Sequence, residues 1–323
     1  MQNHNKKKIF ITAEIGLNHN NNFKKTIKLI NLAIKAGADA VKFQLFQTKS
    51  LWPKSSKEYI YVKKYETNFN FYKKIFFYCK RKKIICYASP FDKFSIDFLK
   101  KLNNPIYKWA SSEIDKLDNL GNVARTRKKI IISTGMANEN DIKKALLRCK
   151  NNKNDNIVLM HCVSLYPQPL KYANLNKLNN LKKFGYDIGF SDHSESNISA
   201  IVAIAKGATY IEKHITWSKK SKGPDHFYAC EINKFKDYVD AIKLANLSLG
   251  KSELELDQKI IFATRRKSYH AKRKIYKNEK LKTKDIFLKQ NLSGINLNEI
   301  KKFIGKKLKK NVLKNKPIKK NYF

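Results

Sequence analysis

Short apolar runs alternate with longer amphipathic stretches from residue 8 to about residue 250. The apolar runs are rich in β-branched and aromatic residues, as in residues 9–13 and 40–44, which favours buried strands. In the first amphipathic stretch, apolar residues recur at helical spacing from Phe23 to Ile34, and Gly37 follows as a C-terminal cap. The pattern therefore predicts a repeated strand–helix unit.

The repeat continues over the next two hundred residues. Further strands are expected at residues 84–89, 106–110, 129–133, 157–161, 187–190 and 208–214. Further helices are expected at residues 70–81, 94–102, 139–149, 174–182, 196–205 and 232–248. Eight strands, most of them followed by a helix, are typical of a parallel (β/α)8 TIM barrel, so we assign residues 1–250 to such a domain.

The pattern changes after residue 250. Residues 251–264 read as a linker or a short helix, and residues 265–323 carry short strands separated by turn signals such as Ser293-Gly294. A segment of this length is near the lower limit for independent stability. We therefore expect a small β-rich domain that docks on the barrel or on a second subunit.

The composition limits the classes of function. The 68 Lys and Arg exceed the 26 Asp and Glu, for a net charge of +42, but the lysines are spread over the whole chain. They accompany many Asn, Ile, Tyr and Phe, which share AT-rich codons, and no nucleic-acid recognition motif accompanies them. We expect no specific nucleic-acid partner, although the charge can attract anionic substrates.

Other sequence signals concern the location of the protein. No apolar run is long enough to cross a membrane, and the N-terminus lacks a signal-peptide pattern, so we expect a cytoplasmic protein without a membrane partner. The five cysteines show no Cys-x-x-Cys spacing, which indicates free thiols rather than disulfides or a zinc knuckle.

Polar side chains follow the ends of nearly all the expected strands, where a barrel builds its active site. Lys42 and Lys108 lie within apolar strands, where an ordinary solvated lysine would be out of place. Hydroxyl donors occur at comparable depth, namely Ser89, Ser111 and Ser133. Lysines with hydroxyl neighbours suit a phosphate or carboxylate, so this set predicts an anion site.

Two histidines stand at the ends of the seventh and eighth strands. His193 follows Gly-Phe-Ser-Asp, and His214 follows Ile-Glu-Lys, so neighbouring strand ends could share one metal ion. A single histidine is more often structural, and this alternative stays open for each of them. Glu14 and Glu113 could act as acid–base groups near the metal or could form structural ion pairs. We expect only supporting hydrogen bonds from His19 and His161.

Eight ordered motifs covering nearly the whole chain resemble the N-acetylneuraminate (sialic acid) synthases and their legionaminic and pseudaminic acid relatives. These motifs are Ala13-Glu-Ile-Gly-Leu-Asn-His19, Gly37-Ala-Asp-Ala-Val-Lys-Phe-Gln44, Tyr107-Lys-Trp-Ala-Ser-Ser-Glu113, Ser133-Thr-Gly-Met136, His161-Cys-Val-Ser-Leu-Tyr-Pro167, Gly189-Phe-Ser-Asp-His193, Ile211-Glu-Lys-His214 and Gly223-Pro-Asp225. The resemblance implies condensation of phosphoenolpyruvate with N-acetylmannosamine or a related 2-acylamino hexose. It also implies a C-terminal antifreeze-like (SAF) domain and a domain-swapped homodimer.

The resemblance assigns roles to residues by position. The phosphoenolpyruvate contacts would be Lys42, Ser89, Lys108, Ser111, Ser133 and Ser191. His193 and His214 match ligands of a divalent metal, manganese or else magnesium, and Glu113 matches the catalytic carboxylate. Glu14, Tyr166 and Asp225 match groups that hold the open-chain amino sugar.

Two positions depart from the family pattern. Gln290 stands where family members commonly carry an SAF arginine that reaches the N-acyl group, with Lys289 as a possible substitute. Ser164 stands where some members have asparagine and keeps a hydrogen-bonding group in the substrate site. The exact sugar therefore stays open at this point.

Three alternatives differ from an N-acetylneuraminate synthase. The chain could be a legionaminic or pseudaminic acid synthase of the same family. It could be a phosphoenolpyruvate-dependent aldolase for a phosphorylated sugar, although no second phosphate cluster is evident. It could also be a basic polyanion-binding barrel without activity, although the full set of lysines, glutamates and histidines favours an enzyme.

Overall fold

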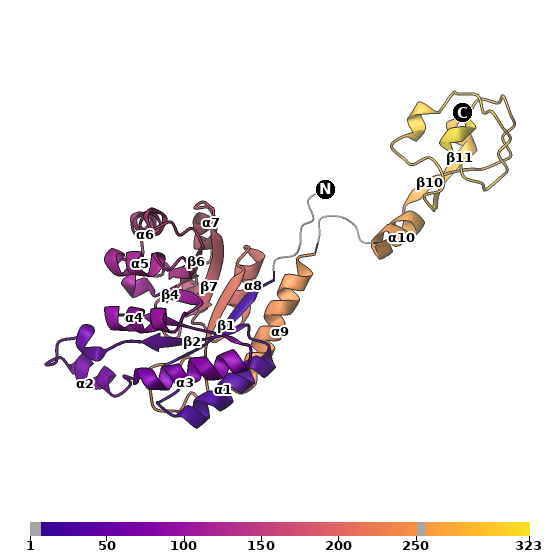
Figure 1. Ribbon diagram of the computed structural model, residues 1–323. Helices are drawn as coiled ribbons and strands as arrows, with labels where there is room; N and C mark the ends of the chain where they lie inside the picture. Colours follow the sequence, from indigo (N-terminus) through magenta and orange to yellow (C-terminus); the bar gives the residue numbers. More distant parts are fainter. Residues whose placement is uncertain (1–7, 251–255) are drawn as a thin grey trace. The chain divides into compact units, whose positions relative to one another are not determined.

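Eight parallel strands form the inner wall of the first of two units into which the chain divides at Leu249 and Gly250. The computed structural model describes residues 8–250 and 256–323. Each strand pairs with the next, and β1 also pairs with β8, which closes the barrel. The barrel strands are β1 (Phe10–Gly16), β2 (Ala40–Leu45), β3 (Ile85–Pro90), β4 (Ile106–Trp109), β5 (Lys129–Ser133), β6 (Ile157–Cys162), β7 (Asp187–Asp192) and β8 (Tyr210–Thr216). The prediction of a TIM-type barrel is confirmed (Figure 1).

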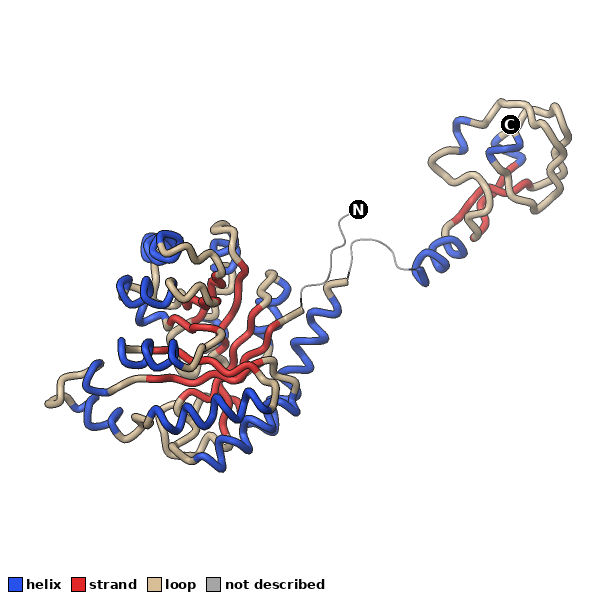
Figure 2. The backbone as a smooth tube through the Cα atoms, viewed as in Figure 1, coloured by secondary structure: helices blue, strands red, loops and turns tan. Residues whose placement is uncertain are grey.

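Helices form the outer layer around these strands, as Figure 2 shows in blue around red. They are α1 (Phe23–Ala36), α2 (Lys57–Lys63), α3 (Phe69–Arg81), α4 (Lys93–Lys101), α5 (Leu117–Ala124), α6 (Glu139–Asn151), α7 (Lys177–Lys182), α8 (Ile198–Ala205) and α9 (Ile232–Ser248). A short strand β9 (Cys230–Glu231) pairs with β8. Single turns of 3-10 helix occur at Thr48–Ser50, Ser111–Glu113 and Leu170–Tyr172.

Helix α5 was not predicted from the sequence. It contains Gly121 and two asparagines within eight residues, all of which have low helix propensity. The helix forms because Leu120, Val123 and Ala124 are buried against the barrel, so packing overrides local preference.

Capping residues explain where several helices begin and end. Asn22 accepts a hydrogen bond from the backbone N–H of Lys25 at the start of α1, and Gly37 ends this helix in the left-handed conformation, with φ of 92°. Asn138 and Asp141 form a reciprocal capping box at the start of α6. These capping residues set where each helix begins or ends, and therefore where the connecting loop starts.

Alternation along the strands divides the barrel interior into layers. At the N-terminal end, an apolar layer fills the lumen, including Tyr87, Ile106, Ile131 and Val158. Two residues further along β2 to β5, the side chains on the same face are polar, namely Lys42, Ser89, Lys108 and Ser133, whereas Met160 continues the apolar layer on β6. The strand ends therefore present polar groups above an apolar floor.

The second unit has a small core of its own. It contains α10 (Leu256–Arg265), the antiparallel pair β10 (Lys267–Ala271) and β11 (Ile286–Gln290), and 3-10 turns at Thr283–Asp285, Ile300–Lys302 and Lys320–Tyr322. Buried apolar residues include Ala271, Ile275, Leu281, Ile295 and Ile318. The SAF assignment of this unit stays a prediction, and residues 251–255 of the expected linker lie outside the described residues.

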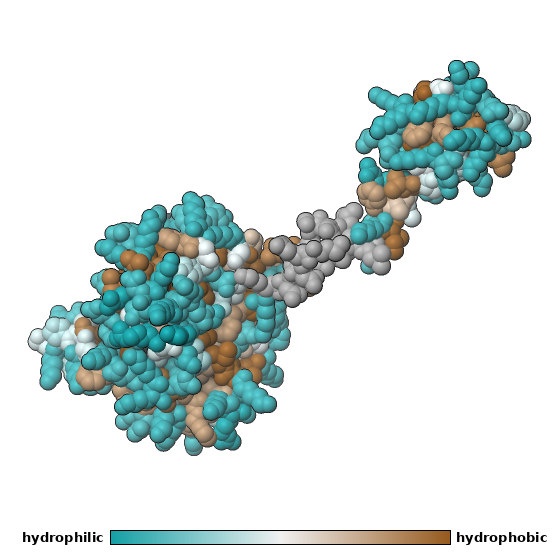
Figure 3. Space-filling model, turned by 45° about the horizontal axis from the view of Figure 1, so that its top comes forward, coloured by the Kyte–Doolittle hydropathy of each residue, from teal (hydrophilic) through white to brown (hydrophobic). Residues whose placement is uncertain are grey.

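Hydrophilic side chains cover most of the visible face of each unit in Figure 3. Within the described residues, no helix is both long and apolar enough to span a membrane. The five cysteines, Cys79, Cys86, Cys149, Cys162 and Cys230, are all free thiols, as the sequence predicted.

Candidate active site

A cavity of about 350 Å³ opens at the C-terminal ends of the barrel strands. Its wall includes most of the residues singled out from the sequence, which come from different strands. Those that line it are Lys42, Ser89, Lys108, Ser111, Ser133, Ser164, Tyr166, Ser191, His193, His214 and Asp225. The strands thus bring together residues that lie far apart in sequence, as a barrel active site requires.

Two buried lysines and the buried Glu212 form the floor of the cavity, and the buried Glu14 lies beneath it. Lys42 Nζ lies 2.9 Å from Oε1 of Glu14 and 3.6 Å from Oε1 of Glu212. Lys108 Nζ lies 2.8 Å from the same oxygen of Glu212. Lys42 also donates a hydrogen bond of 3.3 Å to Ser89 Oγ. The two ammonium groups are therefore held together by one shared carboxylate.

The charges on the floor are set by burial and by these neighbours. Burial alone would raise the pKa of Glu212, but Lys108 and Lys42 lower it to about 2. Burial alone would lower the pKa of Lys42, but Glu14 and Glu212 raise it. For Glu14, burial raises the pKa, and Lys42 only partly opposes this. Lys42 and Glu212 are thus ionised at neutral pH, whereas the pKa of Glu14 lies above its ordinary value.

Hydroxyl groups surround the lysines at the level of the cavity. Ser191 Oγ donates to Glu212 Oε1 at 3.0 Å, and Ser111 Oγ lies 3.3 Å from Ser164 Oγ. Rotatable hydroxyls beside two ammonium groups can turn their donors toward an anion. The floor therefore offers ammonium and hydroxyl donors to a small anion, in competition with Glu212.

His193 and His214 face each other across the upper cavity, with ring centroids 5.6 Å apart. Burial lowers the pKa of His193 to about 4, and burial together with His193 lowers the pKa of His214 well below its ordinary value. His193 Nδ1 lies 2.7 Å from the carbonyl oxygen of Val163 and donates to it, so the lone pair is on Nε2, which lies 3.2 Å from Ser191 Oγ. Both rings are neutral, as metal ligands must be.

These residues fit a divalent metal that takes only two protein ligands. Among residues 8–250 and 256–323, no group of three or more His, Cys, Asp or Glu side chains is placed to hold a metal ion. The remaining positions of such an ion would fall to water and substrate oxygens, which manganese and magnesium prefer.

The buried Oε2 atoms of Glu14 and Glu212 have no hydrogen-bond partner in the protein, so a ligand or water must satisfy them.

The outer part of the cavity combines a carboxyl group with aromatic rings. Asp225 Oδ2 accepts a hydrogen bond of 3.4 Å from the backbone N–H of Leu17 and lies 4.0 Å from His214 Nδ1. Burial raises the pKa of Asp225. The ring of Tyr166 lies 4.4 Å from that of His193 and 4.7 Å from that of Tyr228. Acceptors beside aromatic faces suit the hydroxyl groups and C–H faces of a sugar.

A family model described as the NeuB family matches residues 29–254. The chain belongs to the NeuB family. An N,N'-diacetyllegionaminic acid synthase of Campylobacter jejuni is 36% identical over 325 residues, covering 94% of this chain and 97% of the relative. A pseudaminic acid synthase of the same species is 32% identical, with 95% of this chain and 94% of the relative covered.

Solved structures agree with the NeuB assignment. An N-acetylneuraminic acid synthetase from Leptospira borgpetersenii, solved with citrate, aligns with a TM-score of 0.74 at 30% identity. The alignment covers 80% of this chain and 92% of that one. The fold of this NeuB-family chain is therefore that of known sugar-acid synthases.

Three residues predicted for the site do not line the cavity. Glu14 lies beneath it and reaches it through Lys42 and through Gln44, whose Nε2 donates to Glu14 at 3.1 Å. The carboxylate of Glu113 lies in the turn after β4 and pairs with Lys116, whose Nζ is 2.8 Å away. Gln290 ends β11 in the second unit and is exposed. The predicted roles of these three residues stay predictions.

The two histidines expected to have supporting roles lie outside the cavity lining. His161 makes a 2.8 Å hydrogen bond with the carbonyl oxygen of Ala173. Nδ1 of His19 accepts a hydrogen bond of 3.0 Å from the backbone N–H of Asn21. These bonds are consistent with the structural role expected for both.

Sequence reasoning missed several residues of the NeuB-family site. Glu212 is the most important, because it pairs with Lys42 and Lys108 at once. It precedes His214 by two residues on the same strand, so the alternation of side chains would have placed both on one face. Tyr228 was missed as well, whereas Gln44, which also lines the cavity, is among the polar residues that the sequence places at the strand ends.

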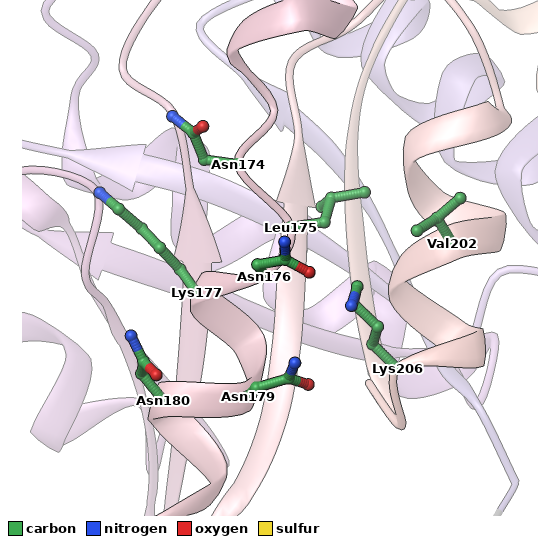
Figure 4. A pocket seen from close by; sticks show the side chains of 8 residues that line it. All are labelled: Asn174, Leu175, Asn176, Lys177, Asn179, Asn180, Val202 and Lys206. Atoms are coloured by element: carbon green, nitrogen blue, oxygen red, sulfur yellow. The ribbon is translucent and has the colours of Figure 1, made fainter.

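A second, larger depression lies on the outer wall between α7 and α8 (Figure 4). Its volume is about 720 Å³, and its lining is mostly asparagine and lysine, such as Asn176, Asn180 and Lys206. The lining contains no histidine or carboxylate, and most of these residues are solvent-exposed. It therefore lacks the buried acid–base groups that the barrel cavity has.

Proposed function

We propose that the protein condenses phosphoenolpyruvate with an open-chain 2-acylamino hexose to form a nonulosonic (sialic-type) acid and phosphate. The observation that carries this proposal is the buried floor of Lys42, Lys108 and Glu212 directly below the His193–His214 pair. Membership of the NeuB family supports it, because relatives named as legionaminic and pseudaminic acid synthases match along nearly the whole chain.

In the proposed reaction, the lysines and the surrounding serines bind the phosphate and carboxylate of phosphoenolpyruvate. Carbon 3 of phosphoenolpyruvate attacks the aldehyde carbon of the sugar, and a carbon–carbon bond forms while the aldehyde C=O π bond breaks and its oxygen takes up a proton. The positive charge that develops on carbon 2 is quenched by addition of water, which loses a proton. The tetrahedral intermediate then expels phosphate by cleavage of its carbon–oxygen bond, which leaves the 2-keto acid.

The residues of this chain would supply preorganised charge for these steps. Lys42 and Lys108 are fixed before substrate arrives, so they can stabilise the phosphate without reorganisation. The unpaired Oε2 of Glu14 is available to accept a hydrogen bond from a sugar hydroxyl group. Glu113 is the proposed carboxylate for proton transfer, and loss of Lys116 from its side would raise its pKa.

A divalent ion, proposed to be manganese with magnesium as the alternative, would be held by His193 and His214. Bound there, it would act as a Lewis acid on the sugar aldehyde. The neutral state of both rings and the donation from His193 to Val163 support this proposal. Imidazole alone does not select manganese, so the choice of ion would depend on water and substrate oxygens.

Within this substrate class, we favour a hexose with two acetamido groups over N-acetylmannosamine. The relative named as an N,N'-diacetyllegionaminic acid synthase supports this choice, at 36% identity. The cavity wall also has an apolar part made by Phe91, Met136, Pro224 and Phe227. Apolar wall suits acetyl methyl groups better than additional hydroxyl groups.

A sugar phosphate is a poorer fit to this cavity. The outer part carries Asp225, with Glu14 beneath it, and no lysine beyond Lys42 and Lys108 lines the wall. A second phosphate group would therefore meet a carboxylate rather than a cation. The rival reading as an inactive polyanion binder gives no reason for an ion-pair network buried inside a barrel.

We further propose that the second unit is an SAF domain, that the protein is a domain-swapped homodimer, and that it works in the cytoplasm, where phosphoenolpyruvate is made. The resemblance of the sequence motifs to the family supports the first two points. Sedimentation of the full chain tests the dimer, and a monomer at micromolar concentration would contradict it.

The central experiment is turnover by the purified full chain with Mn²⁺ and phosphoenolpyruvate. The sugars to compare are N-acetylmannosamine, a 2,4-diacetamido hexose, and arabinose 5-phosphate, with phosphate release and product mass as readouts. Phosphoenolpyruvate labelled with ¹⁸O in the bridging oxygen should release labelled phosphate, because the carbon–oxygen bond breaks. Preference for arabinose 5-phosphate, or no turnover by folded protein, would overturn the proposal.

A further inference from the structure

A second buried ion pair lies on the outer face of the strands that carry His193 and His214. Lys213 Nζ is 3.0 Å from Asp192 Oδ2, and Tyr238 Oη donates to the same oxygen at 2.9 Å. The backbone N–H and the hydroxyl group of Ser194 both donate to Asp192 Oδ1, at 2.9 and 2.7 Å. Asp192 is 1% exposed and Lys213 is 4% exposed, so these are fully enclosed charges.

The pair is placed by the register of β7 and β8. Asp192 lies opposite Lys213, and Ser191 lies opposite Glu212. Because side chains alternate along a strand, Ser191 and Glu212 face the cavity while Asp192 and Lys213 face outward toward α9, which carries Tyr238. Each member of the pair is thus the immediate chain neighbour of one histidine.

The network also ties down the loop that follows His193. Lys213 donates to the carbonyl oxygen of Ser194 as well as to Asp192, and its ammonium group lies 5.0 Å from the centroid of the Tyr238 ring. Residues 192 and 194, on both sides of His193, are therefore bonded to the residue that precedes His214. A change in this network would move one imidazole relative to the other.

Stability alone is a weak reason for such a network. Two charges buried this deeply lose their hydration, and a well-packed apolar pair at the same place would commonly be as stable or more so. Buried ion pairs are better suited to fixing one register among alternatives. None of these side chains lines the cavity, so they cannot act on substrate directly.

We propose that Asp192, Lys213 and Tyr238 are positioning residues that hold His193 and His214 at the separation needed to share one metal ion. The inference rests on the proposed function, since it concerns the same histidine pair. It predicts that removing the ion pair weakens metal binding and turnover while phosphoenolpyruvate binding, which depends on Lys42 and Lys108, is preserved.

The test uses the full-length double variant Asp192→Asn/Lys213→Met, which removes both charges at once and leaves no unpaired ion. Mn²⁺ binding to the metal-free protein, followed by the electron paramagnetic resonance signal of free Mn²⁺, is the first readout. We expect its Kd to rise about 10- to 100-fold, with a similar fall in kcat, as for other groups that orient metal ligands. The KM for phosphoenolpyruvate should stay within about twofold.

Val239→Ala on the same helix is the matched control, because it removes buried apolar contact without touching the network. It should lower the unfolding temperature and leave the Kd for Mn²⁺ unchanged. A double variant that folds and binds Mn²⁺ like the wild type overturns the inference, as does an equal loss of Mn²⁺ affinity in Val239→Ala.

Tyr238→Phe covers the case in which the double variant does not fold, because it keeps the ion pair and removes one hydrogen bond to Asp192. A loss of Mn²⁺ affinity in Tyr238→Phe supports the inference, although we expect it to be smaller than the loss of about 10- to 100-fold expected for the double variant. An unchanged affinity overturns it. If the wild-type protein neither binds Mn²⁺ nor converts substrate, both the proposed function and this inference are wrong. Wild-type activity with unaffected variants sinks the inference alone.

Discussion

The ammonium group of Lys108 lies 2.8 Å from the carboxylate of Glu212, although 104 residues separate them in the chain. Glu212 also lies 3.6 Å from Lys42, so one carboxylate compensates two buried lysines in the absence of substrate. An anion that binds these lysines, as proposed for phosphoenolpyruvate, would have to compete with Glu212 for them. Glu212 therefore stabilises the free protein by pairing with the lysines, and it lowers their affinity for an anion for the same reason.

Replacing Glu212 with glutamine should separate these two quantities. The change leaves Lys108 without its carboxylate, and breaking a buried pair in this way costs about 3–5 kcal/mol of unfolding free energy. Affinity for inorganic phosphate should rise by about tenfold, or about 1.4 kcal/mol, because the competing charge is gone. Urea unfolding and isothermal titration calorimetry measure the two effects. Glu299→Gln, which changes an ion pair in the second unit, is the control, and weaker phosphate binding in Glu212→Gln would contradict the competition.

The ion pair between Glu113 and Lys116 should set the acidic limb of the pH profile. Burial raises the pKa of Glu113, and Lys116 lowers it, so Lys116→Met should raise it further. If ionised Glu113 takes part in catalysis, the acidic limb of kcat/KM moves to higher pH, by an amount that solvent screening reduces because Lys116 is partly exposed. An unchanged limb in Lys116→Met would show that Glu113 is not the titrating group. Lys177→Met, on the outer wall, should leave the profile as it is in the wild type.

His214→Ala should lose activity that no concentration of sugar restores. Removing one of the paired imidazoles should weaken Mn²⁺ binding by at least about 100-fold, because His193 and His214 are the two ligands proposed for the ion. Equilibrium dialysis of the full chain with Mn²⁺ measures this directly. His161→Gln is the matched control, since His161 is equally buried but hydrogen-bonded to the carbonyl oxygen of Ala173 outside the cavity. Unchanged Mn²⁺ affinity in His214→Ala would show that it is not a ligand.

Buried histidines should make the barrel sensitive to mild acid. Burial, with a smaller effect of His226, lowers the pKa of His19 from 6.5 to about 3, so it stays neutral in the folded chain while the unfolded chain takes up a proton below pH 6.5. This contribution to stability is complete above pH 6.5 and is lost as the pH falls toward 3. Between pH 7 and 4.5, the wild type should lose about 2 kcal/mol more unfolding free energy than His19→Gln.

Urea unfolding at the two pH values, followed by tryptophan fluorescence, tests the effect of His19. Trp52, Trp109 and Trp217 are the three tryptophans of the chain and all belong to the first unit, so the signal reports the barrel alone. Equal losses in the wild type and in His19→Gln would contradict the assignment. His193 and His214 also have lowered pKa values, but they are present in both proteins and cancel in the comparison.

The barrel could be predicted from the sequence because its strands are short apolar runs and its helices have one apolar face. The strand at residues 129–133 has the predicted bounds, and the others differ by a few residues at their ends. Helix α5 was missed because Gly121 and its asparagine neighbours conceal a segment that forms through packing.

The candidate site was predictable where residue type was unusual for its surroundings, as for Lys42 and Lys108 in apolar strands. Glu212 was not predicted because its role depends on pairing with Lys42 and Lys108, which come from strands far away in the sequence. The pairing of Glu113 with Lys116 and the outward ion pair of Asp192 and Lys213 could not be foreseen, because both depend on side-chain directions that are set only in the folded barrel.

The apolar layer of Tyr87, Ile106, Ile131 and Val158 closes the N-terminal end of the barrel, so ligands reach the cavity from the C-terminal end of the strands. A ligand bound at Lys42 and Lys108 must therefore enter before the ligand that binds above it. It must also leave after that ligand has left. For a two-substrate reaction this imposes an order: the phosphoenol compound first and the sugar second. A large excess of sugar should then inhibit the enzyme, because sugar bound in the upper cavity would keep the phosphoenol compound from the empty site at the lysines.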